Sequence, residues 1–452
     1  MQHTDRRPQE KESALDGMMT LRIDKPPFLI AMDVIALVLA LYLLIRPSGR
    51  SLLVSAAAAA VAGIAGGLLV WLIVLDLFSV GLTPVTTVWT TLGFAGVGLA
   101  IANLFRSRWW RKLIAAVSIP VFLAAAGAGV NVDFGAYRNL NEVLGVMPYG
   151  PLNLHAEYGE TVTGTDWAST TQQTEARAKG EVGTVRIPAT VSHFPARQAV
   201  VYLPPVALGP KPPALPVLFA LSGQPGAPAD MFTAGRIASF MDAYAAEHNG
   251  YAPIVVAPDQ LGGPGRNPMC VDSHEFGNSA TYLLTDVRNW IASHLRVSND
   301  PAAWGVFGYS EGATCAVQFA TGHPQLFGSA LASSSELGPT LGDEAATIAQ
   351  GFGGSRAAYK KAQPAAMMAA HTPYEKSTIV LAAGENDAKY TAFAKTLHED
   401  AMRAGMHAEL LISPGTAHDW KTVRYTLANG FPKITGQMGL TGIGTARTGG
   451  AG

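Results

Sequence analysis

Four apolar stretches near the N-terminus constrain the fold of this chain more than any other feature of its sequence. Residues 26–130 contain only eight Asp, Glu, Lys or Arg side chains in 105 positions. Each stretch reaches the roughly 18 to 20 residues that a helix needs to cross a hydrocarbon core about 30 Å thick. Backbone polar groups in lipid must bond within their own segment, so helices are the expected form. The sequence predicts a transmembrane four-helix bundle over residues 28–132, with helices at Phe28–Ile45, Leu52–Phe78, Val85–Phe105 and Leu113–Val132.

The distribution of Lys and Arg around these stretches predicts which side of the membrane each loop faces. Cytoplasmic loops carry an excess of these residues within about 20 positions of the helix ends. The loops after the first and third stretches carry six, namely Arg46, Arg50, Arg106, Arg108, Arg111 and Lys112. The opposite side carries three, Lys11, Arg22 and Lys25. We therefore expect a multi-pass protein of the cell membrane whose residues after 132 are extracytoplasmic; the reverse topology is the alternative.

Composition argues against several classes of function. The 452 residues include 32 Lys or Arg and 33 Asp or Glu, which gives a formal charge of −1. A chain without a basic field does not attract a nucleic-acid backbone, so nucleic acid is not an expected partner. The two cysteines are too few for a zinc ribbon or a disulfide-rich scaffold. We expect neither a metal nor a cofactor.

After residue 132 the sequence changes to the mixed pattern of a water-exposed domain. Residues 1–27, 133–182 and 436–452 are expected to be an N-terminal tail, a juxtamembrane connector and a flexible Gly-rich tail. Residues 183–435 alternate short β-rich apolar runs with amphipathic segments, which predicts an α/β domain with a mostly parallel sheet and helices on both faces. The expected strands are Ala199–Leu203, Val217–Leu221, Ile254–Ala257, Trp304–Gly308, Ile379–Ala383 and Leu410–Ile412, and the expected helices lie near residues 234–248, 280–295, 311–322 and 390–404.

The sequence Gly308-Tyr309-Ser310-Glu311-Gly312 follows one of these strands and opens a helix. A G-x-S-x-G pattern in that position is typical of a nucleophile elbow, where the glycines allow a sharp turn that exposes the serine hydroxyl. Ser310 is therefore the candidate nucleophile. An alcohol is a poor nucleophile, so it needs a base to take its proton and a carboxylate to orient that base.

The base and the acid are expected downstream, in the chain order serine, acid, histidine. His418 follows the strand Leu410–Ile412 and is the candidate base. The loop after Ile379–Ala383 offers two carboxylates. We favour Asp387 as the triad acid and keep Glu385 as the alternative.

Two backbone N–H groups are candidates for stabilising the oxyanion of the reaction. One belongs to Glu311, directly after the nucleophile at the start of a helix. The other is expected in the loop Ser222–Gly226, after the strand Val217–Leu221. There we favour Gln224, because Pro225 has no N–H; a plain Gly/Pro turn is the alternative.

Residues 197–431 resemble the esterase branch of the α/β-hydrolases, which includes esterase D, feruloyl esterases and the mycolyltransferases of mycobacteria. The resemblance implies that Ser310, His418 and either Asp387 or Glu385 form a catalytic triad. Ala313 departs from the family, since many relatives have glycine there, and four apolar stretches replace the cleaved signal peptide of secreted mycolyltransferases. The matching segments are Val201-Tyr202-Leu203-Pro204-Pro205, Ser222-Gly223, Gly308–Gly312, Gly384–Asp387 and His418-Asp419-Trp420.

A long loop, Pro258–Ser273, follows a strand and is expected to lie beside the nucleophile. If this loop faces an oxidising compartment, Cys270 is placed to form a disulfide with Cys315, on the helix that follows Ser310. Two buried free thiols are the alternative.

The expected function is that of a membrane-anchored serine esterase at the outer face of an actinobacterial-type envelope. It would cleave or transfer an acyl group carried by a membrane lipid or an envelope component. The candidate substrate-binding residues are Arg266, Asn267 and Asp272, although a solvated loop would explain each of them as well. The resemblance implies an aminoacyl-phospholipid as one substrate, with Glu311 or Asp272 binding its ammonium group. The alternatives are acyl transfer of the mycolyltransferase type and a catalytically inactive membrane binding or scaffold module.

Overall fold

The computed structural model describes residues 17–45, 49–78, 80–105, 107–152, 154 and 179–440. Half of the expected connector (residues 153 and 155–178), residues 1–16 of the expected N-terminal tail and residues 441–452 of the expected C-terminal tail lie outside this part of the chain, as do Lys11, Arg46 and Arg106. The chain divides into two compact units, residues 1–148 and 149–452.

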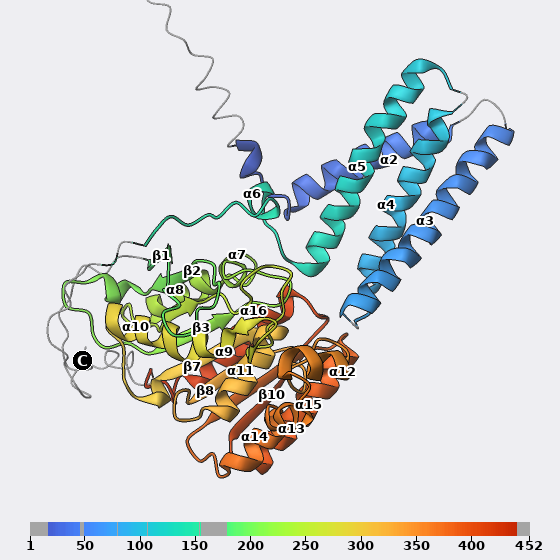
Figure 1. The fold of residues 1–452 in the computed structure, drawn as a ribbon. Coiled ribbons are helices and arrows are strands. Elements are labelled where there is room, and N and C mark those ends of the chain that lie inside the picture. The colour runs from blue at the N-terminus through green and yellow to red at the C-terminus, as the bar shows by residue number, and fades with distance from the viewer. Residues whose placement is uncertain are drawn as a thin grey trace, which may run out of the picture. The chain divides into compact units, whose positions relative to one another are not determined.

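Four long apolar helices dominate the described part of the N-terminal unit (Figure 1). Each has the length and composition needed to cross a membrane. The four predicted helices are confirmed, and their ends differ from the expected ones by at most four residues. The helices are α2 (Pro26–Leu44), α3 (Gly49–Phe78), α4 (Pro84–Leu104) and α5 (Trp109–Phe134), followed by the one-turn α6 (Leu140–Val143).

Glycines bring α3, α4 and α5 close together. A Cβ atom on Gly98 of α4 would lie 2.4 Å from the Cβ of Ala62 on α3. One on Gly129 of α5 would lie 2.2 Å from the ring of Trp89 on α4. Small residues at such crossings let helix backbones pack tightly, as association within lipid requires.

A twisted sheet forms the centre of the C-terminal unit (Figure 1). Among residues 179–440 it has eight strands in the order β1-β2-β4-β3-β7-β8-β9-β10, and β2 alone runs antiparallel to its neighbours. The strands are β1 (Glu181–Val185), β2 (Ala199–Leu203), β3 (Val217–Leu221), β4 (Ile254–Ala257), β7 (Trp304–Tyr309), β8 (Ser329–Ser333), β9 (Thr378–Gly384) and β10 (His407–Ser413). A separate ribbon pairs β5 (Asp272–Ser273) with β6 (Gly277–Asn278).

Helices cover both faces of this sheet. On one face, α8 (Ile237–Glu247) and α16 (Trp420–Ile434) contact each other and share a hydrophobic core with the strands. On the other face, α11 (Glu311–Gly322) packs on β3, β7 and β8, and α15 (Ala388–Arg403) packs on β9 and β10. The predicted α/β class with a mostly parallel sheet is confirmed. The remaining helical segments are α7 (Asp230–Thr233), α9 (Ser279–Thr281), α10 (Arg288–His294), α12 (Glu344–Ala346), α13 (Arg356–Lys361) and α14 (Pro364–His371), with shorter 3₁₀ and π turns at Pro205–Leu208, Tyr282–Val287, Pro301–Ala303 and Thr347–Gly351.

The six expected strands are present, but the strands β1 and β8 and the helix α16 were not predicted. The β8 sequence, Ser-Ala-Leu-Ala-Ser, has no β-branched residue and only one large apolar side chain. All five of its residues are buried, because helices cover it on both sides. A strand of small residues therefore lies in the interior of the sheet, between β7 and β9, without the usual β signal.

The packed C-terminal domain extends beyond the residues expected for it. At its start, Tyr149 makes an edge contact with Phe232, with ring centroids 6.0 Å apart. At its end, Met438 and Leu440 are buried in the core that contains α8 and α16. The domain therefore includes residues outside the expected range 183–435.

Candidate active site

Ser310 lies on a sharp turn between β7 and α11. Its backbone has φ 55° and ψ −114°, a conformation that costs an L-residue free energy. A Cβ atom on Gly308 would lie 1.9 Å from the carbonyl oxygen of Gly312, and one on Gly312 would lie 2.3 Å from that of Leu221. Only glycine fits at either position, which is the geometry of a nucleophile elbow.

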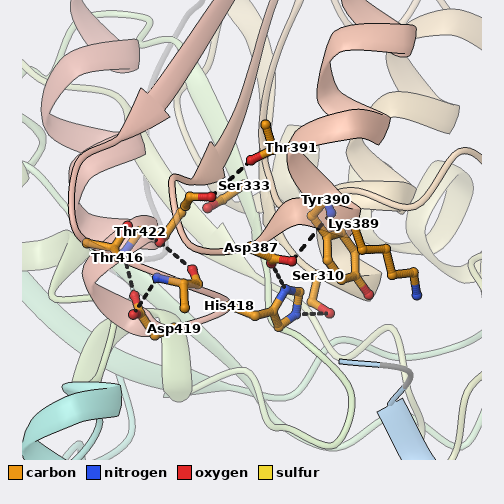
Figure 2. Close-up of polar contacts among 12 residues, drawn as sticks. Ser310, Ser333, Asp387, Lys389, Tyr390, Thr391, Thr416, His418, Asp419 and Thr422 are labelled. Carbon is orange, nitrogen blue, oxygen red and sulfur yellow. Dashed lines mark hydrogen bonds and ion pairs between the residues drawn. The ribbon is translucent and has the colours of Figure 1, made fainter. Parts of the chain in front are cut away.

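Three side chains from three separate loops meet at the carboxyl edge of the sheet (Figure 2). The Nε2 atom of His418 lies 3.0 Å from Ser310 Oγ, and its Nδ1 atom lies 3.1 Å from Asp387 Oδ2. Because parallel strands end at the same edge, the loops after β7, β9 and β10 are neighbours in space. With its Nδ1–H donating to Asp387, the imidazole presents Nε2 to accept the Ser310 proton.

The carboxylate that meets the imidazole is Asp387, the favoured acid of the sequence analysis. Asp387 is buried and caps α15, because its Oδ1 accepts the N–H of Tyr390 at 3.4 Å. The alternative acid, Glu385, is exposed, and its Oε2 accepts the N–H of Gly415 at 2.8 Å. Glu385 therefore joins its own loop to the loop that leads to His418.

Two tyrosine rings flank the imidazole of His418. The ring centroids of Tyr309 and Tyr390 lie 5.2 and 4.3 Å from that of His418. The Tyr390 hydroxyl donates to Glu336 Oε1 at 2.7 Å, and Lys389 Nζ lies 2.9 Å from the same oxygen. Burial, followed by nearby carboxylates, raises the pKa of both phenols, so both remain neutral near pH 7.

The sequence analysis did not identify Glu336, Lys389 or Tyr390 as members of the site. Lys389 and Tyr390 follow Asp387 by two and three residues, so their proximity to it was readable in the sequence. Glu336 follows β8, and its place at the carboxyl edge could be found only by recognising that strand. Figure 2 draws Lys389 and Tyr390 beside Asp387 and Ser310.

The two predicted oxyanion donors come from segments that adjoin Ser310. Glu311 opens α11, and a Cβ atom on Gly223 would lie 3.4 Å from the Cβ of Ser310, which places the loop containing Gln224 beside the nucleophile. No backbone oxygen in the described residues accepts the loop N–H of Gln224. Both N–H groups stay predicted donors.

Cys270 and Cys315 are joined by a disulfide, with an S–S distance of 2.01 Å. This bond ties the loop Pro258–Ser273 to α11, about one helical turn after Ser310. The loop is thereby held beside the nucleophile, as the hypothesis required.

The three candidate substrate-binding residues of this loop are engaged in contacts within the protein. Arg266 and Asn267 each donate to a backbone oxygen, at 2.7 and 3.2 Å. Asp272 accepts two hydrogen bonds from Thr281, at 2.9 and 2.6 Å. These contacts order the loop, and a role in substrate binding stays a prediction.

Comparisons with known proteins give one family and one curated relative. A family model described as "Putative esterase" matches residues 196–433. An uncharacterized protein of Corynebacterium glutamicum is 32% identical over 363 residues, which cover 78% of this chain and 83% of the relative.

Three of the solved structures that are similar to this chain illustrate how low the sequence identity is. A ferulic acid esterase has 18% identity and a TM-score of 0.49, covering 58% of this chain and 99% of that one. An S-formylglutathione hydrolase from Agrobacterium tumefaciens has 20% identity and a TM-score of 0.47, covering 58% and 97%. MPT51 of Mycobacterium tuberculosis has 18% identity and a TM-score of 0.41, covering 57% and 98%.

Replacing Gly308 with alanine is expected to destabilise the C-terminal unit by on the order of 3 kcal/mol, because the new Cβ would overlap the Gly312 carbonyl. Thermal unfolding of the full chain in detergent, followed by tryptophan fluorescence, measures the effect. Gly265→Ala is the matched control, since a Cβ there meets nothing within 4 Å. Equal melting temperatures for the two variants would contradict the packing described for the elbow.

Proposed function

We propose a function from one premise: this chain belongs to the esterase family of α/β-hydrolases, and it is a carboxylic-ester hydrolase or an acyltransferase. The proposed nucleophile is Ser310, with His418 as general base and Asp387 as the carboxylate that orients it. The observation that supports this assignment is the hydrogen-bonded series from Ser310 Oγ through the imidazole to Asp387, at 3.0 and 3.1 Å.

The reaction proceeds in two halves through an acyl-enzyme. His418 Nε2 takes the Ser310 proton while Oγ attacks the ester carbonyl carbon, and the oxyanion that forms is stabilised by the N–H groups of Glu311 and Gln224. The intermediate expels the alcohol, which takes its proton from His418. Water, deprotonated by His418, then attacks the acyl-enzyme, and the acid is released as Ser310 Oγ leaves and takes that proton from His418. If another alcohol replaces water, the same steps transfer the acyl group.

The proposed substrate is an ester carried by a membrane lipid or an envelope component. Support comes from the four membrane-length helices on the same chain, which would hold the site next to a bilayer. We do not prefer an aminoacyl ester to other lipid esters as the substrate, because the two acids expected to bind its ammonium group have partners within the protein. Of the two acids expected to bind its ammonium group, Asp272 is bonded to Thr281 and the carboxyl of Glu311 contacts Gln260.

We further propose that the esterase domain lies outside the cytoplasm. The six-to-three distribution of Lys and Arg around the apolar helices supports this orientation. The disulfide between Cys270 and Cys315 agrees with it, because such bonds persist in oxidising compartments.

A fluorophosphonate probe, which phosphonylates activated serines, should label the full-length protein in detergent at Ser310. Ser310→Ala should abolish labelling. Asp387→Asn should slow it by about 10³- to 10⁴-fold, because the imidazole loses the carboxylate that holds its tautomer. Glu385→Gln, the matched change at the neighbouring exposed carboxylate, should label within about threefold of wild type. Wild-type protein that resists the probe would instead favour the inactive binding module.

Incubation of the protein with total envelope lipids should consume one class of lipid ester, and mass spectrometry identifies the products. A free acid that appears with wild type and not with Ser310→Ala indicates hydrolysis, and a new lipid ester indicates acyl transfer. If wild type leaves every lipid unchanged while it cleaves soluble short-chain esters, the lipid assignment is wrong.

Topology is tested with single cysteines and a maleimide that does not cross membranes. The native cysteines are bonded to each other, so an introduced thiol is the reactive one. On intact cells, Glu375→Cys in the esterase domain should be labelled, whereas Arg50→Cys at the start of α3 should react only after permeabilisation. The reverse pattern would place the esterase domain in the cytoplasm.

A further inference from the structure

The carboxyl group of Glu311 lies among buried groups. Its Oε2 atom is 3.1 Å from Gln260 Nε2. Its Oε1 atom is 3.1 Å from Cys315 Sγ and 3.7 Å from Cys270 Sγ. Gln260 and both cysteines are at most 3% exposed. The carboxyl of Glu311 is thus packed between the Gln260 carboxamide and the disulfide. The N–H of the same residue is a predicted oxyanion donor.

The contact with the disulfide indicates which protonation state this carboxyl has. Disulfide sulfurs carry no hydrogen, so they can only accept a hydrogen bond. A carboxylate oxygen 3.1 Å from Cys315 Sγ would place lone pairs against lone pairs, whereas a carboxylic acid donates its O–H to the sulfur. Gln260 Nε2 donates to the other oxygen and needs no proton there. This contact therefore favours the carboxylic acid form, with its proton on Oε1 of Glu311.

A neighbouring negative charge also favours the protonated form of Glu311. The charged group that faces it is Asp259, whose carboxylate is paired with Arg197 at 2.7 Å. The pKa of Glu311 is raised to about 8. Burial is the largest cause, the hydrogen bond from Gln260 opposes it, and the charge of Asp259 adds to it.

Gln260 connects Glu311 to the other half of the predicted oxyanion site. Its Nε2 atom also donates to the carbonyl oxygen of Ser222 at 2.7 Å, at the start of the loop that contains Gln224. Its own backbone is held because Ser279 Oγ donates to the Gln260 carbonyl at 2.7 Å. A single carboxamide nitrogen therefore contacts both segments that carry the donors.

We propose that Glu311 is a neutral carboxylic acid at pH 7 and that, with Gln260, it is a positioning residue that fixes the two oxyanion donors relative to Ser310. The positioning role rests on the proposed function, whereas the protonation state does not. Ionisation of Glu311 would place a negative charge one residue from the nucleophile, where the reaction develops a second one, and would therefore slow the reaction.

The protonation state is tested by thermal unfolding of the full chain in detergent between pH 5 and 9, without any substrate. The unfolded chain releases the Glu311 proton near its ordinary pKa of 4.5, whereas the folded chain holds it to about 8. Wild type should therefore lose stability relative to Glu311→Gln as the pH rises from 5 to 8, and the difference should level off above that.

Glu399→Gln removes an exposed carboxyl and should give a difference from wild type that does not change with pH. A constant difference for Glu311→Gln as well would overturn the proposal. Infrared spectra of wild type give an independent answer if that variant fails to fold. A neutral-carboxyl band at pH 6 that fades by pH 9.5 is expected, and its absence at pH 6 would also overturn the proposal.

The positioning role is tested by the pH dependence of kcat. Wild-type kcat should fall on the alkaline side around pH 8, and this fall should be absent in Glu311→Gln, whatever its activity at pH 7. Gln260→Ala should lower kcat about tenfold with KM changed less than twofold. An alkaline fall that persists in Glu311→Gln would refute the role of that carboxyl. If Ser310 proves unreactive, these measurements fail with the proposed function, while the unfolding experiment still reports on the proton.

Discussion

Direct contact between backbones at the turn around Ser310 is the constraint on which the site depends. Gly308 and Gly312 approach so closely that one Cβ atom would sit 1.9 Å from a carbonyl oxygen. This contact lets β7 pass into α11 within one residue and brings the helix start against the end of β3. The hydroxyl, the N–H of Glu311 and the loop beside Gly223 are consequently gathered at one place. The positions of the proposed nucleophile and of the predicted oxyanion donors thus both depend on this close packing.

The parts of the site that follow strand ends were predictable from sequence, because the order of elements determines which loops are neighbours. Ser310, His418 and Asp387 each follow an apolar run, and three such runs in a parallel sheet end at one edge. The sequence favoured Asp387 as the acid but left Glu385 open, since both carboxylates lie in one short loop. Only the side-chain directions separate them: one is buried against the imidazole and the other is exposed.

The contacts of Glu311 and Glu336 could not be predicted from the sequence either. Glu311 was expected to face substrate, yet its carboxyl lies against the disulfide and Gln260. Glu336 was missed because β8, the strand before it, is made of small residues and carries no β pattern. In both cases the decisive factor is burial by elements distant in sequence, which periodicity along one segment does not report.

Glu385, the alternative acid, helps to hold two loops of the site together. Besides the bond from Glu385 to Gly415, the N–H of Asn386 donates to the carbonyl oxygen of Thr416 at 2.8 Å. These two hydrogen bonds join the loop of Asp387 to the loop of His418 beyond the ends of β9 and β10. The loop Pro258–Ser273 is attached elsewhere, to α11 through the disulfide and to Ser222 and Glu311 through Gln260. The imidazole with its carboxylate and the segments of the two predicted oxyanion donors are thus held by two separate sets of contacts.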